Sequence, residues 1–306
     1  MGGVFTGFAL VGTIILVGYL AQRSGIAGPH AASVLSRVAF FITNPALLFT
    51  ILATSDLHAI FSALVPVALA AAVLTCLIYW GLSALWFRRK AAETVVGAMA
   101  GSYVNANNIG IPVAVYAIGN AAPVAPVLLA QLLILSPIFL LLLDLATGTK
   151  PTLKALLLQP VRNPMIIASF LGAVTAWSGL ELPPLIWGPL EVLGGAAVPL
   201  VLMAFGMSLP GSRPLKSGGI RTEVLVASAL KSVVMPVLTY ILARYIFGVD
   251  STQTFAAVIM SALPTAQNVF LFSSRYNRGA AVARDSILLT SVTAIPAVLI
   301  TALLLG

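Results

Sequence analysis

The chain has 306 residues, of which 60% are hydrophobic and only 8% are charged, with a mean hydropathy of +1.07. Soluble domains carry roughly 25% charged residues, so this composition excludes a soluble globular protein and predicts a polytopic membrane protein. The formal net charge is +8, but the basic residues are scattered between apolar runs, which argues against nucleic-acid binding and fits the enrichment of Lys and Arg in cytoplasmic loops.

Ten runs along the chain are apolar and long enough to cross a bilayer, which takes roughly 20 residues of helix. They lie at about residues 4–22, 34–53, 60–87, 94–117, 123–146, 160–178, 185–208, 223–247, 253–275 and 281–305. The segments between them are short, and none is typical of a linker to a second folding unit. We therefore expect a single all-α membrane domain over residues 1–306, with ten transmembrane helices.

The basic residues predict the orientation of these spans. Of the 16 Lys and Arg residues, 14 lie in or beside the segments that follow spans 1, 3, 5, 7 and 9. They are Arg23, Arg37, Arg88, Arg89, Lys90, Lys150, Lys154, Arg162, Arg213, Lys216, Arg221, Arg275, Arg278 and Arg284. Because cytoplasmic loops are enriched in Lys and Arg, we expect both termini on the non-cytoplasmic side of the cell (inner) membrane.

Two halves of five spans must run in opposite directions through the membrane, because five is an odd number. We expect repeat one at about residues 1–150 and an inverted repeat two at about residues 151–306. The sequence supports the repeat weakly, for example where Asn44-Pro45-Ala-Leu-Leu in the second span resembles Val198-Pro199-Leu-Val-Leu in the seventh.

Two spans are interrupted by amides, Gly and Pro at corresponding places in the two halves. The first interruption is Asn105–Pro112, where Pro112 has no N–H to donate and Gly110 adds backbone freedom. The second is Ala262–Asn268, about 160 positions later, where Pro264 has the same effect. Interrupted helices at matching positions of inverted repeats indicate a secondary transporter with a substrate site near the middle of the membrane.

Five side-chain amides lie at the two interruptions. Such groups are costly in hydrocarbon unless they are paired, so we expect them to face the interior, where half-helix N-termini add partial positive charge that suits an anion. The alternative is that they only cap the broken helices and bond one another. The candidate substrate-binding residues are Asn105, Asn107, Asn108, Pro112, Pro264, Gln267 and Asn268.

Further polar residues lie inside apolar runs. Lys231 is about eight residues into its span, about 12 Å from the inner end of the helix. It could bind a carboxylate, release its proton to couple transport to the proton gradient, or snorkel to the interface. Gln131 is a mid-span amide that could line the substrate site or help to hold a cation. Asp144 is expected to pair with Arg162 or Lys150.

The motifs argue against an enzyme. No span offers a mid-membrane His for a Ser-His pair, and no phosphate-binding loop of the Gly-x-x-x-x-Gly-Lys-Ser/Thr type occurs. His30 and His58 lie in loops without a second ligand at metal-binding spacing, so we expect no metal site and no cofactor. H+ and Na+ stay open as coupling ions, as does uniport.

The interruptions resemble motifs of the auxin efflux carrier family. The fourth span of that family is similar to Asn105-Ala-Asn-Asn-Ile-Gly-Ile-Pro112 with the following Val-Ala-Val-Tyr. The ninth is similar to Ala262-Leu-Pro-Thr-Ala-Gln-Asn-Val-Phe-Leu-Phe-Ser-Ser-Arg-Tyr276, and the second to Asn44-Pro45-Ala-Leu-Leu. The likeness covers essentially the whole chain in order, without the long cytoplasmic loop of many plant members.

The resemblance implies a ten-span carrier with the fold of bacterial bile-acid sodium symporters. In that fold, helices 1, 2, 6 and 7 form a scaffold, helices 3–5 and 8–10 form a transport domain, and helices 4 and 9 cross at their breaks. Asn105 matches the crossover Asn of the family, and Pro264 matches the Pro that opens the ninth-span motif. Val269 stands where plant carriers have a second Pro. Plant members export indole-acetate, and bacterial members are linked to malonate, malate and similar anions.

We therefore expect a secondary active transporter of a small organic anion that works by alternating access, with Asn105 and the Gln267-Asn268 pair holding the carboxylate. Sodium-coupled uptake in the same fold and a non-transporting membrane sensor stay open as alternatives. Beside the anion and the lipid bilayer, the expected partner is a second copy of the chain, because small residues in the seventh span allow close helix approach. These small residues are Gly194, Gly195 and Gly206.

Overall fold

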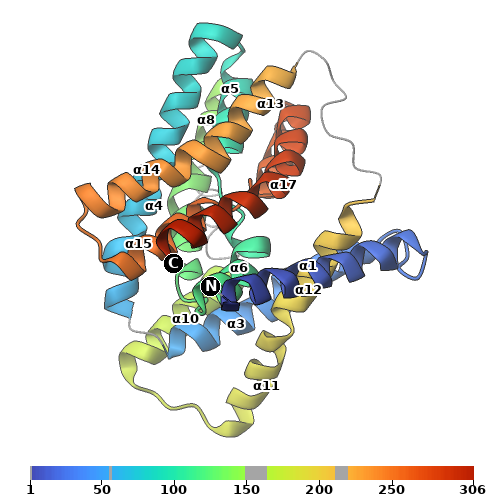
Figure 1. The fold of residues 1–306 in the computed structure, drawn as a ribbon, viewed down its shortest axis with the longest axis vertical. Helices are drawn as coiled ribbons and strands as arrows, with labels where there is room; N and C mark the ends of the chain where they lie inside the picture. The colour runs from blue at the N-terminus through green and yellow to red at the C-terminus, as the bar shows by residue number, and fades with distance from the viewer. Residues whose placement is uncertain (1, 55–56, 149–163, 211–219) are drawn as a thin grey trace. The chain divides into compact units, whose positions relative to one another are not determined.

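The computed structural model describes residues 2–54, 57–148, 164–210 and 220–306. Within these ranges the chain is helical apart from its connecting segments and one isolated β-bridge (Figure 1). The chain divides into two compact units. Unit 1 comprises Met1–Ser62, Asn107–Pro126 and Leu157–Ser212, and unit 2 comprises Ala63–Ala106, Val127–Leu156 and Arg213–Gly306.

The helices of unit 1 come from three separate stretches of the chain. They are α1 (Gly2–Arg23), α2 (Ala31–Val38), α3 (Asn44–Ala53), α6 (Ile111–Val113), α10 (Pro164–Ser178), α11 (Pro184–Gly195) and α12 (Ala197–Ser208). Three short π-helical turns adjoin them. One, η1 (Ala39–Thr43), connects α2 to α3, whereas η3 (Ala106–Gly110) precedes α6 and η4 (Ala114–Ile118) follows it.

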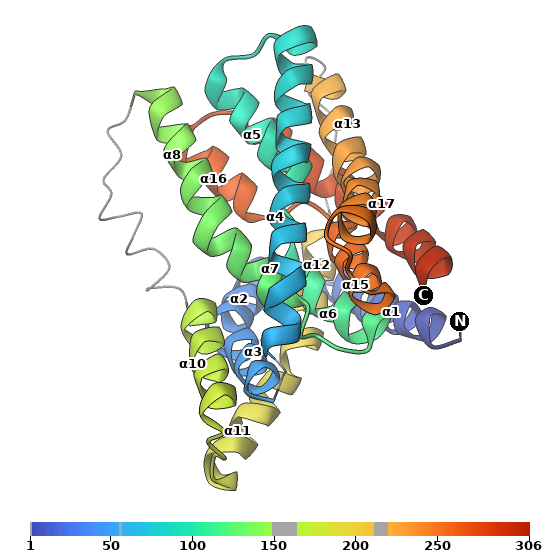
Figure 2. The same cartoon turned by 90° about the vertical axis from the view of Figure 1, so that its left-hand side faces the viewer.

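Unit 2 holds the remaining helices, two of which begin in residues of unit 1, at 57–62 and 124–126. They are α4 (Leu57–Leu82), α5 (Ala91–Ser102), α7 (Val124–Ala130), α8 (Ser136–Thr147), α13 (Arg221–Ala229), α14 (Met235–Ile241), α15 (Ser251–Ser261), α16 (Asn268–Tyr276) and α17 (Ala280–Leu305). Two π-helical turns extend helices: η2 (Ser83–Phe87) extends α4, and η8 (Leu242–Ile246) extends α14. Two others join helices: η5 (Gln131–Leu135) joins α7 to α8, and η7 (Leu230–Val234) joins α13 to α14. Figure 2 shows α5, α8 and α16 next to one another.

Six helices in the described residues are long and apolar enough to cross a membrane, so the chain is a multi-pass membrane protein. They span Ala31–Ala53, Leu64–Phe87, Val124–Thr147, Pro184–Ser208, Arg221–Ile246 and Ala280–Leu305. Asn108–Ile118 and Pro164–Ser178 are shorter apolar helices. The two predicted spans with polar interruptions, 94–117 and 253–275, are divided between shorter helices. The complete set of ten spans and its inverted repeat stay a prediction.

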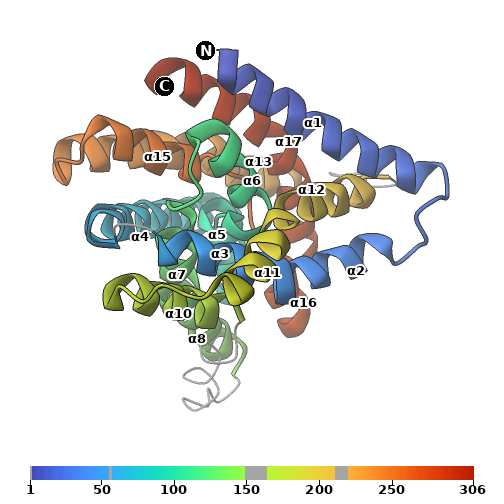
Figure 3. The same cartoon turned by 90° about the horizontal axis from the view of Figure 1, so that it is seen from below.

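Glycines set the closest helix contacts of unit 1. α1 and α12 lie side by side (Figure 3), with Gly18 of α1 against the backbone of Met203 and Gly206 of α12 against the backbone of Ile15. A Cβ atom at either glycine would overlap a carbonyl oxygen of the facing helix. The two helix backbones therefore pack directly on each other, which is the kind of contact that small residues permit between membrane helices.

These contacts change the argument for a dimer, which was that the small residues of the seventh predicted span allow close approach of a second copy. Gly206 packs on α1, and a Cβ atom at Gly194 would lie 3.0 Å from the Cα atom of Leu47 in α3. Both glycines are therefore used inside the chain, where helices of unit 1 approach one another. Gly195 has no atom within 4 Å of a built Cβ. Dimerisation stays a prediction, but Gly194 and Gly206 do not support it.

The centre of unit 2 contains helical segments in which nearly every residue is buried. In α5, ten of the 12 residues are buried, and four of them are Gly or Ala between residues 97 and 101. Small side chains let neighbouring helices approach α5, as where the hydroxyl of buried Tyr79 packs on Gly97. The last six residues of α15, Ala256–Ser261, are also buried. A helix of this composition has no polar face, so it folds only as the core of the unit.

An ion pair joins the segment before α5 to the first turn of α13 in unit 2. Arg89 follows η2, and its Nε atom donates to Oε1 of Glu223 at 2.7 Å. Glu223 lies in the first turn of α13, where a carboxylate also suits the helix dipole. This hydrogen bond raises the pKa of the Arg89 guanidinium above its ordinary value.

Candidate functional site

The first break in a helix lies at the start of the predicted interruption and not at its proline. α5 ends at Ser102, and Tyr103 has an extended backbone with φ −88° and ψ 113°. Helical turns resume at Ala106 and continue past Pro112 to Ile118. Pro112 stands at the start of α6, directly after a π-helical turn, where the hydrogen-bond register changes and a missing N–H is tolerated.

The second break lies where the sequence predicts it. α15 ends at Ser261, α16 begins at Asn268, and Pro264 stands between them. An α-helix through this segment would need an N–H at Pro264 to bond the carbonyl of Met260, and proline has none. The local chemistry therefore accounts for the end of α15.

Residues of the two breaks pair with each other. Val104 and Thr265 form an isolated antiparallel β-bridge. The N–H of Asn105 donates to the carbonyl of Pro264 at 2.8 Å, and the N–H of Ala266 donates back to the first break at 2.9 Å. Backbone groups freed by the breaks in both helices thus bond each other, which is what a buried, water-poor interior requires.

Two threonines add side-chain hydrogen bonds to this pairing. The hydroxyl of Thr265 donates to the carbonyl of Ala100 at 2.5 Å, and the N–H of Thr265 donates to Oγ1 of Thr290 at 3.1 Å. Both threonines are fully buried. The second break is therefore attached to α5 and to α17.

Tyr103 connects the first break to two other segments of unit 2. Its hydroxyl lies 2.5 Å from Oγ of Ser136 and donates to the backbone carbonyl of Gln131 at 3.4 Å. It also hydrogen-bonds the side chain of Asn268. The Tyr103 side chain is only 1% exposed, and its ring packs near that of Phe139. Sequence reasoning missed Tyr103, because a tyrosine beside an apolar run has many structural uses.

The structure brings together four predicted site residues in unit 2. Asn105 and Pro264 share a backbone hydrogen bond, and Tyr103 joins Asn268 to the backbone of Gln131. Asn105 and Gln131 are buried at 4% exposure, whereas Asn268 and its neighbour Gln267 are half-buried. The amides of the second break thus have the greater access to a solute.

The other candidate residues of the first interruption belong to unit 1. Asn108 is half-buried in η3, and Pro112 is buried at the start of α6. The side chain of Asn107 lies outside the described part of the structure. The substrate-binding role of these three residues stays a prediction.

Lys231 lies in η7, and its side chain is fully buried. Its Nζ atom donates to the carbonyl oxygen of Ser261 at 2.5 Å. The ammonium group therefore points to the end of α15 and does not snorkel toward an interface. Neither ion pair found among the described side chains involves Lys231.

Asp144 has a partner that the sequence did not suggest. Its Oδ1 atom accepts a hydrogen bond of 2.7 Å from the hydroxyl of Tyr276, which joins the last turns of α8 and α16. The predicted partners, Arg162 and Lys150, lie outside the described residues.

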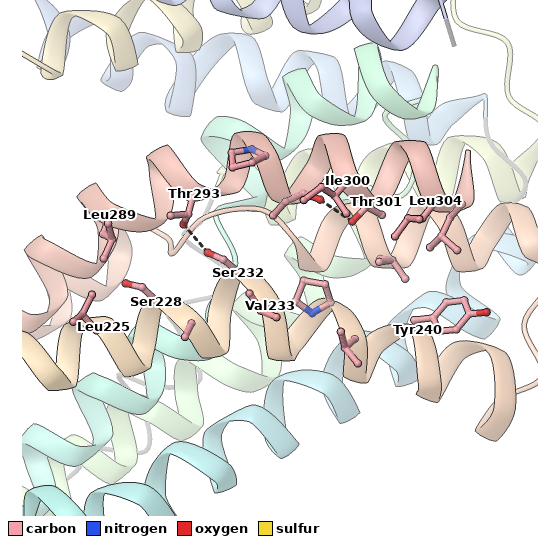
Figure 4. Close-up of a pocket in the computed structure, with 17 residues that line it drawn as sticks. Leu225, Ser228, Ser232, Val233, Tyr240, Leu289, Thr293, Ile300, Thr301 and Leu304 are labelled. Atoms are coloured by element: carbon pink, nitrogen blue, oxygen red, sulfur yellow. Dashed lines mark hydrogen bonds between the residues drawn. The ribbon is translucent and has the colours of Figure 1, made fainter.

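A separate cavity of about 700 Å³ lies between α13, α14 and α17 (Figure 4). Its walls are mostly aliphatic, and two of the lining hydroxyls, those of Ser232 and Thr293, hydrogen-bond each other at 2.7 Å. Apolar walls suit hydrocarbon, whereas a carboxylate needs several donors. The paired breaks, and not this cavity, are therefore the candidate anion site.

Replacing Tyr103 with phenylalanine tests how far its hydroxyl holds the first break. We expect the free energy of unfolding to fall by about 1–3 kcal/mol, because Ser136 and the Gln131 carbonyl lose a buried partner. Thermal unfolding in detergent measures the change, with Tyr245→Phe as the control because Tyr245 is 70% exposed. Equal melting of the two variants would show that the hydroxyl contributes nothing.

The amino-acid sequence is similar to known membrane proteins over most of its length. The model of a family described as membrane transport protein matches residues 4–302. A protein of Rhizobium meliloti named "Putative malonate transporter" is 26% identical over 292 residues, covering 93% of this chain and 90% of the relative. An "Uncharacterized transporter" of Methanothermobacter thermautotrophicus is 26% identical over 260 residues, covering 83% and 82%.

The family model covers nearly the whole chain, including both units and both breaks. The relatives match over most of their own length as well, so the similarity is not confined to one motif. The chain therefore belongs to the membrane transport protein family, the auxin efflux carrier family that its interrupted spans resemble.

Proposed function

We propose that this protein is a secondary active transporter that moves a small organic anion, a mono- or dicarboxylate, across the cell membrane by alternating access. The observation that carries the proposal is the pairing of two broken helices, lined by amides, in the buried centre of unit 2. Broken helices of this kind form the substrate sites of several transporter folds. A relative named as a malonate transporter favours a dicarboxylate.

The proposed site holds the carboxylate with neutral donors. Asn105 comes from the first break, and Gln267 and Asn268 come from the second, where α16 begins. The N-terminal end of a helix carries partial positive charge, so α16 adds to the attraction for an anion without a charged side chain. Gln131 and Lys231 belong to the same unit and contribute to its shape and charge balance.

The units suggest how alternating access works. Unit 2 contains most residues of predicted helices 3, 5 and 8–10 together with the first part of helix 4. Unit 1 contains those of helices 1, 2, 6 and 7 together with the second part of helix 4. In our proposal unit 2 carries the anion, and unit 1 serves as the scaffold. We also propose, from the distribution of Lys and Arg along the chain, that both termini face away from the cytoplasm.

Flux into liposomes tests the proposal directly. Protein reconstituted into vesicles should take up labelled malonate, malate or indole-acetate when a gradient is imposed, and empty vesicles should not. Saturable binding without flux would contradict transport and favour a sensor. An absolute need for Na+ would favour sodium-coupled uptake, whereas flux driven by a pH gradient alone would favour proton coupling.

A further inference from the structure

The C-terminal end of α15 is buried, and its last carbonyl groups need partners. The four final carbonyls of an α-helix have no partner within the helix and carry partial negative charge. The backbone N–H of Ala262 donates to the carbonyls of Val258 and Ile259 at 2.9 and 3.2 Å. The carbonyl of Ser261, at the end of the last turn, still needs a donor. Pro264 follows and has no N–H to offer.

Lys231 supplies the missing donor from a neighbouring helix. Its side chain is fully buried in unit 2, and its Nζ atom lies 2.5 Å from the carbonyl oxygen of Ser261. Neither of the ion pairs among the described residues involves it, and its hydrogen-bond partner is a backbone carbonyl and not a carboxylate. A buried ammonium group is costly unless it is compensated, and the negative end of a helix dipole provides compensation.

We propose that the ammonium group of Lys231 is a built-in cation that holds the broken end of α15. In ion-coupled carriers, the C-terminal ends of half-helices and unwound carbonyls are where a coupling cation binds. Here the chain provides the positive charge itself, through a covalently attached group. Lys231 is thus a positioning residue, which acts on the anion site by holding the segment that leads from α15 to Gln267 and Asn268.

The inference deepens the proposed function, because it implies that Na+ does not bind at this helix end in the wild-type protein. It does not depend on transport, however, since the contact between Lys231 and Ser261 is a property of the folded protein. A shortened side chain at this position leaves both the space and the partial negative charge of the helix end. A small soluble cation should then be able to take the place of the ammonium group.

Thermal unfolding of the full chain in detergent tests the inference at constant ionic strength. Wild type should melt at the same temperature in sodium, methylammonium and N-methylglucamine chloride. Lys231→Ala should melt about 3–10 °C lower in N-methylglucamine, and methylammonium or Na+ should restore at least half of the loss. Lys90→Ala is the control, because Lys90 is exposed, and it should behave like wild type.

Lys231→Met separates charge from space. The methionine side chain fills the room but has no charge, so this variant should melt below wild type whichever cation is present. Wild-type melting of Lys231→Met would overturn the proposal. So would a Lys231→Ala variant that melts like wild type but has lost anion binding, because Lys231 would then be an anion ligand.

The two proposals can fail independently. Absence of flux in wild-type liposomes, combined with selective rescue of Lys231→Ala by methylammonium, would refute transport and leave the role of Lys231 intact. Flux that is normal in wild type, combined with no effect of any cation on the lower melting temperature of Lys231→Ala, would refute the role of Lys231 and leave transport intact.

Discussion

Replacing Asn105 with alanine is expected to weaken anion binding by about 5- to 150-fold, the equivalent of about 1–3 kcal/mol for a lost buried hydrogen-bond partner. The side chain of Asn105 is buried at the first break, while its backbone N–H bonds the carbonyl of Pro264. The substitution removes the amide and leaves that backbone bond in place. The pairing of the two breaks should therefore survive.

Binding and folding must be measured together for this variant. Titration of labelled malonate onto purified protein gives the affinity, and thermal unfolding reports the fold. Asn277→Gly is a suitable control, because it also removes an amide, at an exposed residue whose positive φ of 51° glycine adopts easily. Its affinity should equal that of wild type.

The amide of Gln267 provides the complementary test at the second break. If Asn105→Ala and Gln267→Ala both retain wild-type affinity and flux in folded protein, the paired breaks have only a structural role. The anion would then bind elsewhere.

Replacing Gly206 with alanine is expected to destabilise the protein by about 1–3 kcal/mol, which lowers the melting temperature by several degrees. A Cβ atom at this position overlaps the carbonyl oxygen of Ile15 and lies 2.9 Å from the backbone N of Tyr19. Because both atoms belong to the backbone of α1, no side-chain rotation can relieve the overlap. The helices α1 and α12 must separate.

The same substitution at Gly195 is a matched control in the neighbouring helix. No atom lies within 4 Å of a Cβ atom built there, and alanine favours a helix over glycine by up to ~1 kcal/mol. Gly195→Ala should therefore melt at or slightly above the temperature of wild type. Gly206→Ala that melts together with Gly195→Ala would contradict the close contact of α1 with α12.

Several features of this protein follow from the sequence alone, because their causes are local. Long apolar runs with few charges are incompatible with water, so the membrane class needs no knowledge of contacts. Pro264 removes an N–H from its own segment, so the end of α15 near this residue is also predictable. The interrupted spans were enough to indicate a family that the whole-chain comparison then showed.

Other features were decided by contacts between residues far apart along the chain. The first helix breaks at Tyr103–Asn105, where the backbone can pair with Pro264 and Ala266, and Pro112 is accommodated in a helical turn. Gly206, which we expected at a dimer surface, packs on α1 instead. In both cases the local sequence allows more than one outcome.

The partners of buried polar groups show the same limit most clearly. The sequence left three roles open for Lys231, and in the structure its ammonium group donates to the carbonyl of Ser261. Likewise, Tyr103 hydrogen-bonds Ser136, and Asp144 accepts a hydrogen bond from Tyr276. A sequence shows that a buried donor must find an acceptor. Only the packing of helices determines which acceptor lies within about 3 Å, because hydrogen bonds require a short distance and a suitable angle that no local pattern specifies.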